Sequence, residues 1–188
     1  DIPQCPPAMT ANNAPSPVVI SASHESTWGS GAPAYCGCYN CNYGTHYAYF
    51  SSYPYGPANE WWKIDLGSAK AFKSLTYNNH SDKGIKRGYV QASNNNSDWT
   101  TLYDGTGSDW PTGTITINFS SNETAYRYWR LYATAGYSSN SIQFSDFRFY
   151  PIEGICPDLS GNGNHGTPYY GPTYQDSPHR LRRGILVS

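Results

Sequence analysis

The sequence predicts an all-β protein built as an antiparallel sandwich or barrel. Apolar and polar residues alternate in segment after segment, which places successive side chains on opposite faces of a strand. No segment spaces its apolar residues with the period of a helix. Gly, Asn, Asp, Ser or Pro separate the alternating segments, as expected of turns between short strands.

Seven segments carry this strand pattern. The first in the chain, "WWKIDLG", places Trp62, Ile64 and Leu66 on one face. The others are "AFKSLTY", "GYVQAS", "WTTLY", "TITINF", "YRYWRLYA" and "SIQFSDFRFY", each rich in β-branched or aromatic residues. In "TITINF" we expect Ile115, Ile117 and Phe119 to face inward and Thr114, Thr116 and Asn118 to face outward. In the last segment the apolar phase changes between Phe144 and Phe147, which predicts a β-bulge near Ser145.

Composition narrows the classes of partner. The chain has 188 residues, 13% charged and 16% aromatic, with a formal net charge of -1. This charge supplies no field that would attract nucleic acid or anionic lipid, so we expect neither as a partner. No apolar run is long enough to span a membrane. Surfaces of neutral polar residues are common outside cells, and we expect an extracellular, secreted or virion-surface protein.

The five cysteines make disulfides plausible, and their odd number leaves at least one thiol over. Cys5 and Cys156 flank almost the whole patterned region. If they pair, the closed loop would stabilise the fold by roughly 4–5 kcal/mol on the chain-entropy model. The alternative is two buried thiols.

Five stretches resemble, in order and spacing, the discoidin or coagulation-factor type C family, and most closely its carbohydrate-binding modules. They are "PPAMTANNAPSPVVISAS", "EWWKIDLGSAKAFKSLTY", "GYVQASNNNSDWTTLYDGTG", "AYRYWRLYATAG" and "SIQFSDFRFY", which together cover roughly residues 6–150. This resemblance implies a jelly-roll β-sandwich with galactose-binding-like architecture and ligand loops at one end. A terminal disulfide is common in part of the family, so we expect a domain of residues 1–156 closed by Cys5–Cys156.

The chain departs from the family at a calcium-binding turn. Relatives carry an Ala-Phe-Asp-Gly turn whose aspartate helps to hold a structural calcium, whereas residues 36–41 of this chain read "CGCYNC". Asp146 occupies the place of the acidic residue that completes the same site. The resemblance therefore implies at most a calcium held by Asp146 and backbone carbonyls, and we expect no other cofactor.

The cysteine cluster has three interpretations. Cys36, Cys38, Cys41 and His46 could form a zinc site, although C-x-C spacing is uncommon in structural zinc sites. A Cys36–Cys41 or Cys38–Cys41 disulfide would pin the loop that has lost its calcium turn. All three cysteines could also be reduced. We expect the disulfide, as a covalent replacement for the metal.

Neutral sugars bind where an aromatic face lies beside polar donors and acceptors. The candidates in the loops are Trp28, Tyr43, Tyr47, Tyr53, Tyr55 and Tyr137, with the polar residues His46, Asn79, His80, Arg87 and Asn140. Trp28 and His46 fall in the long polar segment 21–59. In sugar-binding relatives, the loop after the "SLTY" strand supplies polar and basic groups and the loop before the last strand supplies an aromatic ring. This implies His80, Arg87 and Tyr137 as contacts, with Asn79 next.

Four asparagines begin N-x-S/T patterns: Asn79, Asn95, Asn118 and Asn122. A glycan on Asn79 would obstruct the expected sugar site.

These features predict a non-catalytic carbohydrate-binding or adhesion module whose partners are glycans. Nucleophile-elbow, phosphate-loop and H-E-x-x-H motifs are absent from the sequence, so we expect no enzyme. Membrane insertion through the loops is not expected, because their tips carry Tyr, Asn, Ser and Gly.

Residues 157–188 resemble the opening of a laminin-G or concanavalin-like module, truncated after its first strand. An apolar fragment such as "GILVS" suits strand addition to another copy. The alternative hypothesis is therefore a structural subunit of an extracellular or virion fibre whose tail pairs with a neighbouring copy.

Overall fold

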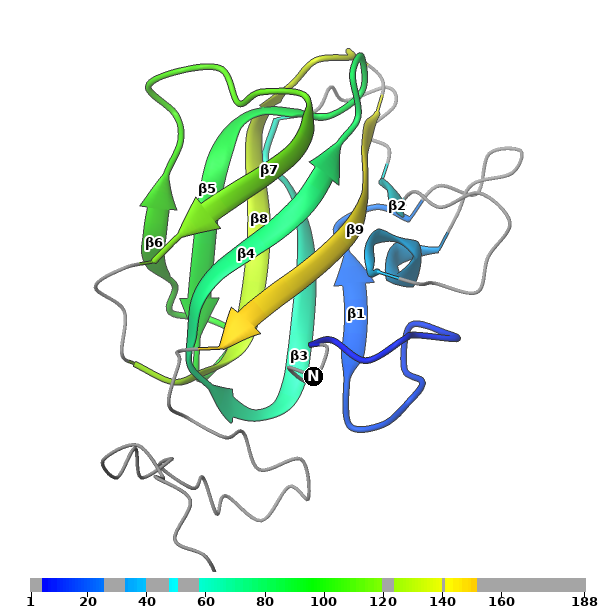
Figure 1. Cartoon of the computed structure of the whole chain (residues 1–188), viewed down its shortest axis with the longest axis vertical. Helices are drawn as coiled ribbons and strands as arrows, with labels where there is room; N and C mark the ends of the chain where they lie inside the picture. The colour runs from blue at the N-terminus through cyan, green and yellow to red at the C-terminus, as the bar shows by residue number, and fades with distance from the viewer. Residues whose placement is uncertain are drawn as a thin grey trace, which may run out of the picture. The chain divides into compact units, whose positions relative to one another are not determined.

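The computed structural model describes residues 5–25, 33–39, 48–50, 58–119, 124–139 and 141–151. Within them it forms two antiparallel sheets (Figure 1). The five-stranded sheet has the order β1-β3-β8-β5-β6, from Val19–Ala22, Glu60–Lys70, Tyr126–Gly136, Ile85–Ser93 and Thr100–Asp104. The four-stranded sheet has the order β2-β9-β4-β7, from Ala48–Phe50, Ile142–Pro151, Phe72–Asn79 and Gly113–Asn118. The predicted antiparallel jelly-roll β-sandwich is confirmed.

All seven predicted segments form strands, and the predicted faces are correct. Trp62, Ile64 and Leu66 are buried at 1% exposure or less. Strand β7 alternates as expected, with Ile115 and Ile117 buried and Thr114, Thr116 and Asn118 exposed. The structure adds β1, β2 and a short 3-10 helix, η1 (Ala34–Gly37), which the polar loop composition did not reveal.

Aromatic side chains fill the space between the sheets. Trp62 packs edge-on against Phe144 with ring centroids 5.0 Å apart, and Phe72 stacks on Phe149 at 4.2 Å. Trp129 meets Phe149 at 5.0 Å. Each buried side chain of this size contributes about 2–3 kcal/mol to folding through removal of apolar surface from water.

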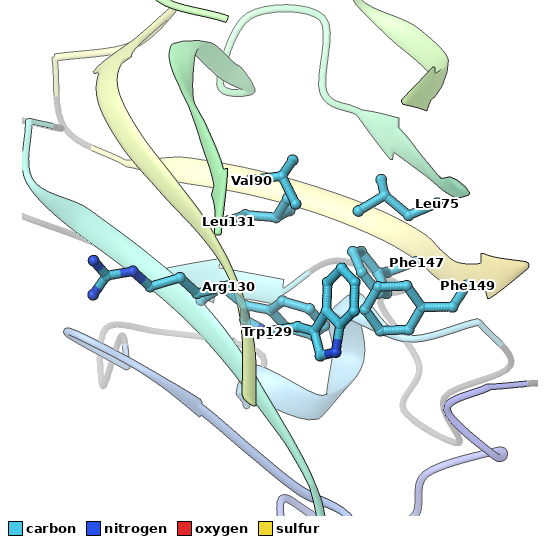
Figure 2. A pocket seen from close by; sticks show the side chains of 8 residues that line it. Leu75, Val90, Trp129, Arg130, Leu131, Phe147 and Phe149 are labelled. Atoms are coloured by element: carbon cyan, nitrogen blue, oxygen red, sulfur yellow. The ribbon is translucent and has the colours of Figure 1, made fainter. Parts of the chain in front are cut away.

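Among the described residues, side chains fill the hollow between the two sheets. Figure 2 shows Leu75, Val90 and Leu131 among the side chains that line this hollow. The hollow has no space for a water molecule. This hollow is therefore part of the packed core and has no room for a ligand.

The predicted bulge in β9 is confirmed. Thr76 pairs with Arg148 and Asn78 pairs with Ser145, so β9 has one residue more than β4 across this step. Asp146 lies there with φ 56°, in the left-handed region that non-glycine residues rarely adopt. The extra residue lets both Phe144 and Phe147 point into the core.

The chain divides into two compact units, Asp1–Glu153 and Gly154–Ser188. The second unit lies outside the described residues. The domain boundary at 156, the laminin-G-like opening and the strand-addition hypothesis therefore stay predictions. No helix in the described part is long and apolar enough to cross a membrane.

Candidate functional site

Three loops meet at one end of the sandwich, the upper end in Figure 1. They follow β4, β6 and β8, and backbone hydrogen bonds join them. Tyr137 N–H donates to the Gly84 carbonyl at 3.0 Å, and Trp110 N–H donates to the Lys86 carbonyl at 2.8 Å. Gln143 N–H donates to the Lys83 carbonyl at 2.6 Å. These bonds bring residues 80–87, 105–112 and 137–139 into one surface, which we call the loop-end site.

Asn79 holds this site together from below. Its side-chain Nδ2 donates to the carbonyls of Ile85 and Pro111, both at 2.9 Å, and its Oδ1 accepts from Ile85 N–H at 2.8 Å. The residue is 1% exposed. Both amide hydrogens are thus used inside the protein, so Asn79 positions the loops. The predicted contact of Asn79 with a sugar stays a prediction, and in this structure the residue is buried beneath the surface of the loops.

Gly84 is required by this arrangement. A Cβ at position 84 would lie 2.3 Å from Asn79 Oδ1 and 2.6 Å from the His80 carbonyl oxygen. Any side chain there would therefore displace the amide hub or the turn.

The structure places His80 at the rim of the loop-end site. Its Nδ1 lies 2.7 Å from Asp82 Oδ1, and its side chain is 24% exposed. Its backbone N–H donates to the Gln143 carbonyl at 3.3 Å, which ties the turn to β9. His80 is therefore oriented by a carboxylate while part of its ring faces solvent.

Arg87 forms an exposed ion pair in the same site. Its Nε donates to Asp109 Oδ1 at 2.8 Å, and Lys86 Nζ lies 3.5 Å from Asp109 Oδ2. The hydrogen bond from Arg87 lowers the pKa of Asp109, against the opposing effect of burial. Arg87 and Asp109 are 47% and 43% exposed, so a donor and an acceptor lie side by side where a pair of sugar hydroxyls could meet them.

Tyr137 lies half-buried between the loops. Its hydroxyl donates to the Trp110 carbonyl, and Lys86 Nζ lies 5.8 Å from the centre of its ring. The Trp110 ring is itself buried, and its Nε1 donates to the Gly105 carbonyl at 2.9 Å. The hydroxyl of Tyr137 is thus anchored to the backbone of a residue whose own side chain is buried.

Of the predicted contacts, the structure brings His80, Arg87 and Tyr137 to one end. Sequence reasoning missed Asp109 and Trp110. The "SDWPTG" turn between two strands, with an acid beside an aromatic residue, was the signal that could have found them. The remaining candidates lie outside the described residues and stay predictions: Trp28, Tyr43, His46, Tyr47, Tyr53, Tyr55 and Asn140.

A second polar cluster joins the end of β1 to the start of β3. Ser23 Oγ donates to the buried carboxylate of Glu60, and His24 Nδ1 lies 3.0 Å from the same oxygen. Trp61 N–H donates to Ser23 Oγ at 3.0 Å. In a nucleophilic triad the serine would donate to the histidine, whereas here both residues bind Glu60. The cluster therefore fastens the segment that precedes the long loop.

The cysteine segment packs against the β9 bulge. Cys36 and Cys38 are buried. The backbone of Cys38 forms an isolated parallel β-bridge with that of Phe147. The predicted partner Cys41 lies outside the described residues, as does His46, so the disulfide and zinc interpretations stay untested. Cys5 is a free thiol whose pKa burial raises to about 12, and its predicted partner Cys156 also lies outside the described residues.

The residues near Asp146 fit calcium poorly. Asp146 Oδ2 already accepts a hydrogen bond from Ser145 Oγ at 2.8 Å. Nowhere in the described segments do three or more His, Cys, Asp or Glu side chains gather as metal ligands would. A single carboxylate is a weak donor set for a cation that prefers six to eight oxygens.

The fold and this site define a galactose-binding-like β-sandwich of the discoidin type. Residues 41–131 match the family model described as NedA-like, galactose-binding domain. The resemblance to the discoidin, or F5/F8 type C, family is confirmed. A comparison with curated proteins found no match.

Solved carbohydrate-binding modules share the fold. One is CpGH89CBM32-5 of Clostridium perfringens, in complex with GalNAc-beta-1,3-galactose, with a TM-score of 0.59 and 14% identity over 71% of this chain and 94% of that one. A second is chitosan-binding module 2 of a chitosanase/glucanase from Paenibacillus sp. IK-5, in complex with chitotriose, with a TM-score of 0.57 and 20% identity over 70% and 95%. A third is the family 32 module of C. perfringens NanJ in complex with galactose, with a TM-score of 0.54 and 14% identity over 70% and 92%. At these identities the similarity establishes the fold.

Proposed function

We propose that this chain is a non-catalytic carbohydrate-binding module that binds neutral glycans at the loop-end site. The observation that carries the proposal is the convergence of His80, the Arg87–Asp109 pair and Tyr137 on loops fixed by the buried Asn79. The solved modules of the same fold, bound to galactose, to a GalNAc-galactose disaccharide and to chitotriose, support it.

Recognition would combine two kinds of contact. The C–H face of a sugar ring would rest against Tyr137, while adjacent hydroxyls donate to Asp109 and accept from Arg87. Because Arg87 and Asp109 already pair and stay near half exposed, a ligand would replace water around groups that are in place before it arrives. A small, open site of this kind binds with millimolar to micromolar affinity, or about -4 to -8 kcal/mol.

The chemistry of the site favours binding over hydrolysis. A glycosidase needs one carboxylic acid that stays protonated near neutral pH. The pKa of Asp109 is lowered by the hydrogen bond from Arg87, so this group stays ionised and is unsuited to act as the acid. We propose in addition that the module works outside the cell, because surfaces with few charges and glycan ligands are both common there.

A glycan array followed by calorimetric titration of the full chain tests the proposal. Arg87→Ala and Tyr137→Ala should each weaken binding of the best neutral ligand by about tenfold, which is the loss of about 1.4 kcal/mol. Arg148→Ala is the matched control, since Arg148 also stacks on a tyrosine ring, that of Tyr39 at 3.6 Å, but on β9. Absence of binding to any neutral glycan at millimolar concentration, or equal losses in all three variants, would refute the proposal.

A further inference from the structure

The outer face of the five-stranded sheet carries a second group of aromatic and polar side chains. On β8, Trp129 and Leu131 point into the core, so Tyr128, Arg130 and Tyr132 point outward. Figure 2 shows Arg130 leaving the strand on the side opposite to the core residues. None of the three outward residues is buried.

Strand register places two cations directly opposite each other on this face. Lys63 of β3 pairs with Arg130 of β8, which pairs on its other side with Gln91 of β5. Two residues along the same two strands, and on the same face, Trp61 of β3 pairs with Tyr132 of β8. Like charges directly opposite each other across two strands destabilise a sheet, so this arrangement calls for a compensating group.

Arg130 is held by neutral partners. Its guanidinium carbon lies 4.0 Å from the centre of the Trp99 ring and 4.9 Å from that of Tyr132. Its Nε donates to Gln91 Oε1 at 2.8 Å. The rings and the amide hold the guanidinium in a fixed orientation without neutralising its charge.

Lys63 is held in the same manner. Its Nζ lies 4.8 Å from the centre of the Trp61 ring and donates to Asn96 Oδ1 at 2.9 Å. Burial lowers the pKa of Lys63, and the charge of Arg130 lowers it further, against the opposing attraction of Asp65. Burial also lowers the pKa of Arg130. Both shifts indicate that a nearby anion would stabilise the two cations.

The carboxylate of Asp65, on the same face, is already paired with a different arginine. One row away, Asp65 accepts two hydrogen bonds from Arg127, from Nε at 2.7 Å and from Nη2 at 2.9 Å. Across the segments that the structure describes, neither Lys63 nor Arg130 forms an ion pair with a carboxylate.

We propose that Lys63, Arg130 and Gln91, with the rings of Trp61 and Tyr132, form a second binding site, for a glycan that bears carboxylates. The planar guanidinium and the ammonium receive the sugar carboxylate, the Gln91 amide lies beside them, and the C–H face of the sugar ring rests against an aromatic face. A nucleic acid fits less well, because two cations are too few to follow a phosphate backbone. The site is independent of the loop-end site, since the two share no residue.

Two ligands that differ only in charge test this site. They are a tetrasaccharide of glucuronic acid and N-acetylglucosamine, and the same tetrasaccharide with its carboxylates converted to methyl esters. Calorimetric titration of the full chain should show binding of the acid form that weakens as salt is added, and binding of the ester that is weaker than that of the acid and does not depend on salt. Lys63→Gln and Arg130→Gln should each weaken binding by about tenfold.

Two control variants separate this site from general charge and from the loop-end site. Arg148→Gln removes one charge and one ring contact from the other sheet, and Arg87→Ala alters the loop-end site; both should stay within about twofold of the wild type. Thermal unfolding shows whether each variant is folded. If Arg130→Gln does not fold, the loss of binding to the acid tetrasaccharide is measured with Lys63→Gln alone.

Three results would overturn the proposal: equal binding of acid and ester, an equal loss in Arg148→Gln, or tighter binding of a single-stranded DNA of the same charge. Because Arg87→Ala affects only neutral ligands on this reasoning, failure of the second site and failure of the loop-end site give different patterns.

Discussion

Replacement of Asn79 by alanine should destabilise the fold and abolish glycan binding together. The change removes three hydrogen bonds, leaving the N–H and carbonyl of the buried Ile85 and the part-buried carbonyl of Pro111 without this partner. Each bond contributes about 0.5–1.5 kcal/mol net, and each buried group left unmatched adds to the cost, so we expect a loss of about 3–4 kcal/mol. For a domain of this size, that corresponds to a fall in melting temperature of about 6–16 °C.

Urea unfolding followed by tryptophan fluorescence measures this loss, and calorimetric titration at a temperature where the variant is folded measures binding. Ser81→Ala is the matched control, because it removes the same N-x-S/T pattern while leaving Asn79 in place; the Ser81 hydroxyl makes only an exposed contact of 3.4 Å with Asp82. The control should behave as the wild type. A loss below about 1 kcal/mol for Asn79→Ala, or loss of binding in Ser81→Ala, would refute the role of Asn79 as a buried hub.

Four further expectations follow from other parts of the fold. Gly105→Ala would place a Cβ 1.8 Å from the indole nitrogen below the loop-end site and should cost about 2–3 kcal/mol in urea unfolding, whereas Gly107→Ala, with nothing within 4 Å, should be neutral. Burial alone would raise the pKa of Asp65, but hydrogen bonds from Arg127 and a backbone N–H give a net lowering. Because the folded pKa lies below the unfolded one, Arg127→Gln should cost up to about 1 kcal/mol above about pH 4, and the difference from wild type should vanish as the pH falls through the lowered pKa. Tyr77→Phe removes a buried hydroxyl that has no hydrogen-bond partner in the described part of the chain, and melting should show unchanged stability or a gain of up to about 1 kcal/mol. EDTA should change the melting temperature by less than about 1 °C, because a single carboxylate at the β9 bulge holds calcium weakly; a large fall would show that calcium is part of the fold.

The strands could be predicted from the sequence because their signal is local. Alternation of apolar and polar residues fixes which face is buried, and the change of phase between Phe144 and Phe147 even located the bulge. Strand β2 is three residues long and lies in a segment whose composition is that of a loop, so no window of alternation marks it. Its existence depends on pairing with β9, which is distant in the sequence.

The role of Asn79 could not be predicted, for a related reason. A polar residue at the end of a strand is equally compatible with a surface contact and with a buried bridge. The choice is made by Pro111, which lies 32 residues away and accepts one of its hydrogen bonds. Resemblance to sugar-binding relatives pointed to His80, Arg87 and Tyr137 together, and the structure has all three at one end of the sandwich. The same resemblance does not predict that the side chain of Asn79 is buried while those of the other predicted contacts are partly exposed.

A buried hub beneath an exposed binding surface lets the site bind a ligand through few contacts, because the loops are already ordered. Ordering a loop costs about 1–2 kcal/mol for each residue fixed, so ordering even a few residues would cancel the roughly 4–8 kcal/mol that binding provides. Here the amide of Asn79 and the indole of Trp110 fix the loops during folding, so this entropy is lost before the ligand arrives. The exposed Arg87 and Asp109 can then be substituted without disturbing the loops, whereas the buried Asn79 and Trp110 cannot. Substitutions at exposed positions should therefore alter which glycan binds, whereas substitutions at the hub should remove binding of every glycan.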